Sequence, residues 1–89
     1  MLFVTLIKFK KEPGAVAEFG EKMLKNLPKG FKVTNAIWTL GQYDAVWIIE
    51  APSEIELFSY FLNSGGLQYA KTETLVGVPR EEIIKILEV

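Results

Sequence analysis

Apolar and polar residues follow two different periods along this chain, and the periods alternate. Residues 2–10 are apolar at both odd and even positions, which is typical of a strand near the centre of a sheet. After Pro13 the apolar spacing changes to three and four residues, which predicts an amphipathic helix that ends at residues 28–30. The apolar stripe of this helix consists of Val16, Phe19, Met23 and Leu27.

The middle of the chain predicts two strands and a second helix. Residues 31–40 and 43–51 have strand character, and Gly41-Gln42 between them is typical of a two-residue type II′ hairpin turn. Ser53 and Glu56 then form a capping box, which indicates the start of a helix. The buried stripe of that helix consists of Ile55, Phe58, Phe61 and Leu62.

The remaining segments complete a known order of elements. Residues 63–66 stop the second helix, residues 69–78 predict a last strand, and Pro79 opens a short terminal helix. The order β-α-β-β-α-β predicts one α+β domain over residues 1–89, with a ferredoxin-like, four-stranded antiparallel sheet and a short C-terminal helix. Both main helices are expected on one face of the sheet.

The predicted hairpin register assigns each strand residue to a face. A two-residue loop pairs Leu40 with Tyr43, and side chains alternate from there. The side facing the helices then holds Phe3, Ile7, Phe9, Ala36, Trp38, Leu40, Tyr43, Ala45, Trp47 and Ile49. The open side holds the apolar residues Val4, Leu6, Val33, Ile37, Val46, Ile48 and Leu75, and the polar residues Lys8, Lys10, Asn35, Thr39, Asp44, Glu50, Lys71 and Glu73.

This open side is too apolar to face water in an isolated domain. Burying it gains roughly 25 cal/mol per Å² of apolar area, so we expect a homodimer, or a higher homo-oligomer, formed sheet to sheet. The alternative is that the terminal helix folds across the open side within one chain.

Composition excludes several classes of function. The net charge is −1, from ten basic and eleven acidic residues, and Arg80 is the one arginine, so no nucleic-acid partner is expected. Cysteine and histidine are absent, which excludes thiol nucleophiles, histidine acid–base chemistry and zinc sites built on these residues. We expect no metal and no cofactor. The opening apolar run is short and lacks a cleavage signal, so we expect a strand, no membrane partner and a cytoplasmic location.

The hairpin end of the sheet carries the candidate site. Asp44 is the one aspartate of the chain, and the topology places it at the mouth of a cavity between two sheets. There it could act as a base or bind a polar ligand group. The candidate ligand-binding residues are Asp44, Thr39, Ile37, Lys8 and Lys10. In the structural interpretation Asp44 instead pins the hairpin, the lysines are solvated, and Trp38 and Trp47 lie in the core.

Residues 38–46 read W-T-L-G-Q-Y-D-A-V and resemble the signature of the GYD domain family, with one residue inserted between Gly41 and Tyr43. Residues 49–52 and 71–75 are also similar to that family. The resemblance implies a ferredoxin-like fold related to the dimeric α/β barrel group, and it implies no particular activity. Within the motif, Gly41 supplies a positive φ and Trp38 with Tyr43 can form an aromatic cross-strand pair.

Three functions are compatible with these features. The first is a homodimer that binds a small, largely apolar molecule between its sheets, with Asp44 and Thr39 orienting a polar end. The second is a cofactor-independent enzyme of the dimeric α/β barrel type, similar to a monooxygenase or isomerase, which the lack of histidine disfavours. The third is an assembly protein. Frequent lysine and glutamate are also typical of heat-adapted proteins.

Overall fold

The computed structural model describes residues 1–88. Its elements follow the predicted order, with one additional short turn of 3₁₀ helix, η1. In chain order they are β1 (Leu2–Phe9), α1 (Pro13–Lys25), β2 (Lys32–Trp38), β3 (Ala45–Glu50), α2 (Glu54–Ser64), η1 (Gly66–Gln68), β4 (Ala70–Gly77) and α3 (Arg80–Leu87). The α+β, ferredoxin-like prediction is therefore confirmed.

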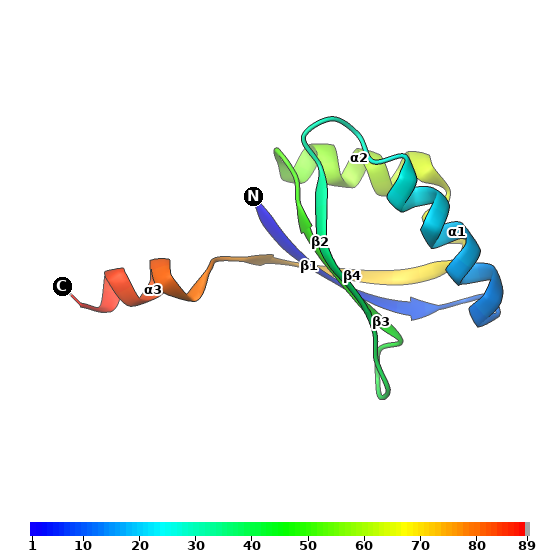
Figure 1. Ribbon diagram of the computed structural model, residues 1–89, viewed down its shortest axis with the longest axis horizontal. Helices are drawn as coiled ribbons and strands as arrows, with labels where there is room; N and C mark the ends of the chain where they lie inside the picture. The colour runs from blue at the N-terminus through cyan, green and yellow to red at the C-terminus, as the bar shows by residue number, and fades with distance from the viewer. Residues whose placement is uncertain (89) are drawn as a thin grey trace.

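The four strands form one antiparallel sheet in the order β2-β3-β1-β4. The central strands are thus β3 and β1, and β1 pairs along its whole length with β4. Both α1 and α2 lie on the same side of the sheet (Figure 1). The other side has no helix over it within the described residues.

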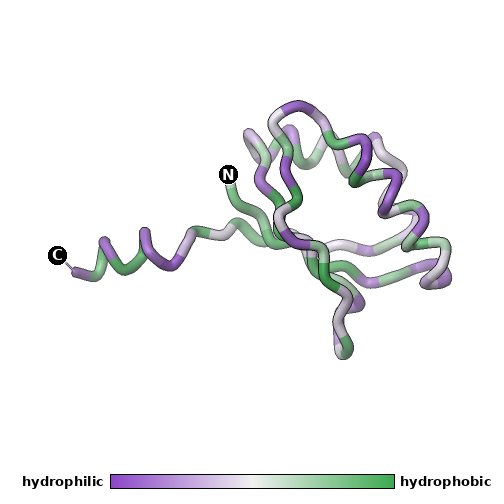
Figure 2. The backbone as a smooth tube through the Cα atoms, in the orientation of Figure 1, coloured by the Kyte–Doolittle hydropathy of each residue, from purple (hydrophilic) through white to green (hydrophobic). Residues whose placement is uncertain are grey.

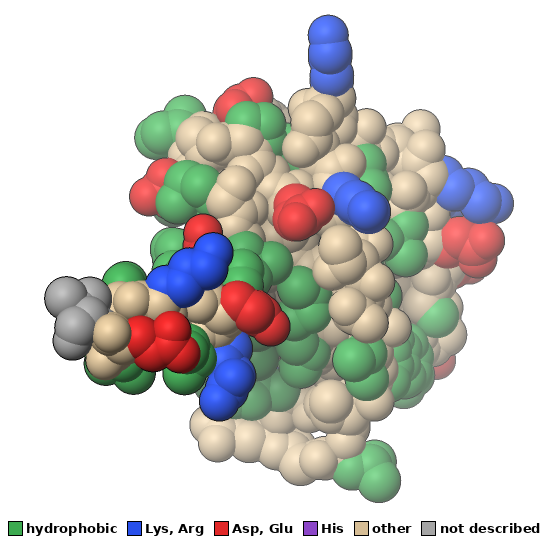
Figure 3. Space-filling model, turned by 60° about the vertical axis from the view of Figure 1, so that its left-hand side comes forward, with side chains coloured by type: hydrophobic (Ala, Val, Ile, Leu, Met, Phe, Trp, Pro, Cys, Tyr) green, Lys and Arg blue, Asp and Glu red, His purple; other side chains and the backbone are tan. Residues whose placement is uncertain are grey.

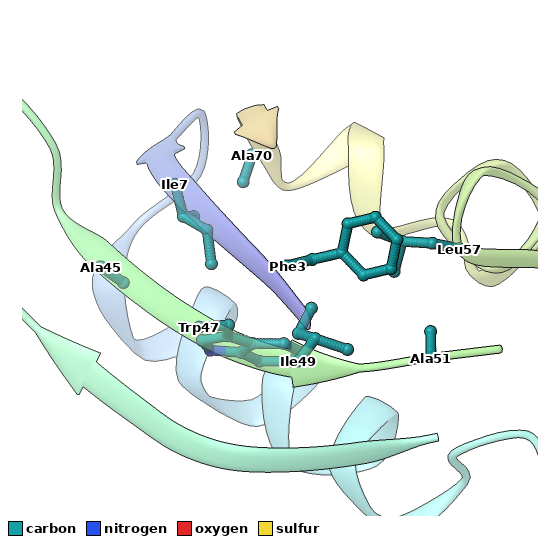
Figure 4. Packing of buried hydrophobic residues seen from close by; sticks show 8 residues of the cluster. All are labelled: Phe3, Ile7, Ala45, Trp47, Ile49, Ala51, Leu57 and Ala70. Carbon is teal, nitrogen blue, oxygen red and sulfur yellow. The ribbon is translucent and has the colours of Figure 1, made fainter. Parts of the chain in front are cut away.

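The core lies between this sheet and its two helices. Every second residue from Phe3 to Ile7 of β1 and along β3 is buried, as the predicted faces require. Leu57 of α2 is buried against them from the helix side. The buried members of the core are Phe3, Ile7, Ala45, Trp47, Ile49, Ala51, Leu57 and Ala70 (Figure 4). The ring of Phe3 and the side chain of Leu57 point toward each other in Figure 4. The face assignment of the two central strands is therefore confirmed.

One open-face assignment is wrong because β2 contains a bulge. The pairing shifts between Val33 and Asn35, so Thr34 is an extra residue on β2. The Thr34 hydroxyl donates to the carbonyl of Ile48 at 3.4 Å. Val33 consequently pairs with the buried Ile49 and packs against the core instead of the open side.

The hairpin loop is wider than the two-residue turn predicted for it. The backbone N–H of Thr39 donates to the carbonyl of Asp44 at 2.9 Å, in the predicted register, but β2 ends at Trp38 and β3 begins at Ala45. Gly41 has the expected positive φ, 132°. Leu40 lies fully exposed in the loop and does not pack under the helices. Leu40 lies beyond the paired residues of β2 and β3, so strand pairing does not fix the direction of its side chain.

Local signals define both ends of α2. The Ser53 hydroxyl accepts the backbone N–H of Glu56 at 3.2 Å, which satisfies one of the free donors at the start of the helix. Gly65 ends the helix with φ 85°, a left-handed conformation that glycine adopts without strain. The predicted stop signal is present, and so is the Ser53 half of the capping box. The Glu56 carboxylate accepts the Ser53 hydroxyl at 3.3 Å rather than the Ser53 backbone N–H.

The terminal helix does not cover the open face. Figures 1 and 2 show α3 projecting from the end of β4, away from the rest of the chain, which gives the molecule extents of 49 × 31 × 17 Å. The alternative in which this helix folds across the sheet of its own chain is therefore wrong. None of the helices in residues 1–88 has the length and apolar character to span a membrane.

The core predicts a clear difference between two isoleucines. Ile49 is 0% exposed and Ile55 on α2 is 78% exposed. We expect Ile49→Val to lower the free energy of unfolding by about 1 kcal/mol, because it removes a methylene group from a packed site, and Ile55→Val to leave it nearly unchanged. Urea unfolding at one fixed protein concentration measures both values. Equal effects of the two changes would contradict this packing.

Candidate functional site

The open face of the sheet is apolar along its middle. Directly paired residues of neighbouring antiparallel strands share a face, so the register defines this surface without further assumption. Val4 lies between Ile48 and Leu75, and Leu6 lies between Val46 and Glu73. Ile37 pairs with Val46 and extends the surface onto β2. The apolar members are Val4, Leu6, Ile37, Val46, Ile48 and Leu75.

Charge replaces apolar character toward the hairpin end. The next open-face position on β1 after Leu6 is Lys8, which pairs with Lys71 on β4. Like charges on directly paired residues repel each other. Glu73 is the next open-face residue of β4 after Lys71 and supplies a nearby negative charge. The open face therefore ends in a mixed polar rim.

Asp44 connects the hairpin to the end of β1. One carboxylate oxygen, Oδ2, accepts the backbone N–H of Phe9 at 2.8 Å. The backbone N–H of Asp44 donates to the carbonyl of Ile7, also at 2.8 Å. The side chain thus takes the place of a strand carbonyl where β3 turns away from β1. This geometry matches the structural interpretation of Asp44, and a role in ligand binding stays a prediction.

Two other predicted site residues bind the loop itself. The Thr39 hydroxyl donates to the carbonyl of Tyr43 at 2.8 Å. The ammonium of Lys8 donates to the carbonyl of Gln42 at 3.1 Å. Both bonds satisfy carbonyls that have no partner in the strand ladder. The Thr39 bond closes the loop on itself, and the Lys8 bond holds the loop against the end of β1.

Tyr43 lies on the opposite side from the one predicted. Its hydroxyl donates to Oε1 of Glu73 at 2.7 Å, and the register places Glu73 on the open face. Trp38 accordingly forms an edge-to-face pair with Phe9, at 4.9 Å between ring centroids, in place of the expected pair with Tyr43. Trp38 is also exposed, so of the two tryptophans Trp47 alone belongs to the core.

The hydrogen bond also changes the acidity of the phenol. A negatively charged acceptor stabilises the protonated form of its donor and disfavours a second negative charge beside it. The bond to the Glu73 carboxylate therefore raises the pKa of the Tyr43 phenol above its ordinary value, with partial burial as a smaller cause. Tyr43 is protonated and donates at neutral pH.

The structure brings most of the predicted site residues together. Asp44, Thr39 and Lys8 converge on the hairpin loop, and Ile37 lies next to them on the open face. Lys10 is the exception, because its ammonium donates to the carbonyl of Leu67 at 2.9 Å, in the segment between α2 and β4. Residues 1–88 contain no cluster of acidic side chains arranged to hold a metal ion.

Tyr43 is the polar group that sequence reasoning missed at this rim. Strict alternation from a tight turn assigns it to the helix side. No sequence signal reports that the loop is wide enough for its ring to cross to the other side.

The fold and this rim define a class of protein: a small ferredoxin-like α+β domain with one bare sheet face and a polar hairpin at its end. The chain belongs to the GYD domain family, whose model matches residues 5–87. No curated protein matches the chain.

Removing the Asp44 carboxylate tests its role at the end of β1. We expect Asp44→Ala to lower the free energy of unfolding by about 1–3 kcal/mol, because the Phe9 N–H loses its partner in a half-buried position. Asp44→Asn keeps an acceptor and should cost less. Hydrogen exchange at the Phe9 amide is the direct measurement, with Glu50→Ala at the far end of β3 as the control. Unchanged Phe9 protection in Asp44→Ala would exclude this role.

The Tyr43–Glu73 pair predicts a pH effect. We expect Glu73→Gln to lower the pKa of Tyr43 toward its ordinary value of about 10, measured by alkaline titration of tyrosine absorbance at 295 nm. Because the folded-state pKa is the raised one, the stability from this bond is full below the unfolded-state pKa and is lost as the pH rises through the folded-state pKa. Glu18→Gln on the exposed face of α1 is the control and should leave the titration unchanged.

Proposed function

We propose that this domain associates with a second copy through the open sheet face and holds a small, largely apolar molecule between the two sheets. The observation that carries the proposal is the apolar middle of that face, which no element of the described chain covers. Monomeric proteins rarely leave a continuous apolar surface of this kind in water.

The size of the face is compatible with a specific interface. At roughly 3.3 Å per residue and roughly 4.8 Å between strands, an eight-residue strand in a four-stranded sheet covers about 26 × 19 Å. Two such faces bury about 1,000 Å² in total, which is near the lower bound for a specific protein–protein contact. Branched side chains such as Val4 and Ile48 interdigitate well between sheets packed about 10 Å apart.

The polar rim supplies an orientation for the bound molecule. Lys8 and Lys71 face each other across β1 and β4, and an anionic group on the ligand would relieve their repulsion. The Tyr43 hydroxyl lies on the same face. In this proposal Asp44 and Thr39 position the loop that carries Tyr43, and the apolar body of the ligand lies over Leu6 and Ile37. A small amphiphile with a negatively charged end is the ligand class that fits.

A pair of lysine substitutions tests the association. Ile48 lies on the open face and Ile55 on the exposed side of α2. We expect Ile48→Lys to raise the dissociation constant of the sheet-to-sheet contact at least about tenfold, since it places a charge in an apolar interface. We expect Ile55→Lys to leave that constant unchanged. Sedimentation equilibrium over a micromolar concentration range measures both. A wild-type chain that remains monomeric there would overturn the proposal.

A fluorescent amphiphile tests the binding. We expect 8-anilinonaphthalene-1-sulfonate to bind the wild-type protein with one or two sites per dimer, several-fold more weakly to Lys71→Gln, and not measurably to Ile48→Lys. Lys29→Gln, on a loop away from the open face, is the control. If Ile48→Lys bound the dye as tightly as the wild-type protein, the dye would bind outside the open face. If an intact wild-type dimer did not bind the dye, the result would favour an assembly protein without a ligand.

A further inference from the structure

The C-terminal arm, residues 78–88, presents apolar side chains that its own chain leaves uncovered. Ile86 is 66% exposed and Leu87 is 72% exposed, and Ile83 lies one turn before them on the same helix. Of the other positions of α3, Arg80, Glu81, Glu82 and Lys85 are charged, and the apolar Ile84 is half-buried. In Figure 3 the arm carries hydrophobic and charged side chains side by side and stands out from the body.

An eight-residue helix is not stable by itself in water. Helices shorter than about 12–15 residues are marginal in isolation, because the cost of nucleation is not recovered over so few hydrogen bonds. The capping of α3 is also modest, since Pro79 at its start makes no side-chain hydrogen bond. The helix therefore requires a surface on which its apolar stripe packs.

The connection to β4 directs the arm away from its own domain. Val78 precedes a proline and is β-branched, and both features favour an extended backbone. Pro79 has φ −56° and ψ 142°, so the chain continues outward from Gly77. To fold α3 back over its own sheet, the chain would have to reverse direction at Val78 and Pro79, and both residues favour an extended backbone.

A second apolar surface remains uncovered on the helix side of the sheet. The α2/β4 groove, a hollow of about 400 Å³, is lined by apolar side chains that include Phe58 and Leu62, which are 64% and 59% exposed. Val76 is one of the lining residues and pairs with the core residue Phe3, so the groove lies on the face opposite the open one. Association through the open face leaves it free.

We propose that α3 docks into the α2/β4 groove of a second copy of this chain. The arm and the groove are complementary in shape, since a short apolar helix fits an apolar groove beside another helix. The stripe from Ile83 to Leu87 spans about 6 Å, the same span as Phe58 to Leu62 on α2. Glu54 is the charged residue in the groove lining, and Lys85 flanks the stripe on the arm. This docking of α3 uses the helix side of the sheet and is therefore independent of the open-face contact.

The absence of cysteine allows a direct test with the full chain. We mix an Ile86→Cys chain with a ¹⁵N-labelled Leu62→Cys chain, oxidise mildly and measure intact masses. The expected result is a mixed-isotope disulfide dimer at least about fivefold more abundant than in a mixture of Ile86→Cys with Lys29→Cys. Adding Ile83→Asp to the Ile86→Cys chain should reduce the product to the level of that control.

Two outcomes would overturn the proposal. One is a yield of mixed dimer equal to that of the Lys29→Cys control. The other is a chain carrying both Ile86→Cys and Leu62→Cys that forms an internal disulfide as its main product at dilute concentration, because the arm would then occupy its own groove. The cross-linking experiment is repeated with Ile48→Lys added to both chains, which weakens the open-face contact. The disulfide between α3 and the groove is expected to form in these chains as well.

Discussion

A four-stranded sheet has two faces, and this chain covers one of them. The 13 residues of α1 and the 11 residues of α2 lie on the same side, over the alternating core residues of β1 and β3. The third helix is directed outward and adds nothing to either face of its own sheet. The uncovered face is therefore the main unsatisfied feature of the molecule, since the hydrophobic effect penalises each apolar surface that stays in water.

The polar residues near the hairpin have a common task. Asp44, Thr39 and Lys8 each direct a side chain at a backbone group that the strand ladder leaves without a partner. The loop is thereby fixed in one position, and the Tyr43 hydroxyl is held over the far strand by Glu73. A rim built in this way is rigid before any ligand arrives, which lowers the entropic cost of binding.

Periodicity predicted the central parts of the fold because burial determines them. Burial alternates along β1 and β3, and the register predicted for the hairpin placed Phe3, Ile7, Trp47 and Ile49 on the helix side, where they are buried. The errors in the strands lie where alternation is interrupted. The bulge at Thr34 moves Val33 to the helix side of the sheet. In the wide loop, Leu40 and Tyr43 do not lie on the face that strict alternation predicts for them. On α2 the predicted buried stripe is wrong as well, because Ile55, Phe58 and Leu62 are exposed and Leu57 is the buried residue. The direction of α3 depends on two backbone angles that no apolar pattern encodes.

The bulge at Thr34 has a consequence for how large an assembly can grow. Strand β2 is an edge of the sheet, and a flat edge offers unpaired amides and carbonyls to any passing strand. The extra residue bends and twists β2, and the charged side chain of Lys32 stands at its beginning. Pairing through the β2 edge is therefore obstructed. A continuous ribbon needs both edges of the sheet, so edge-to-edge polymerisation is obstructed as well.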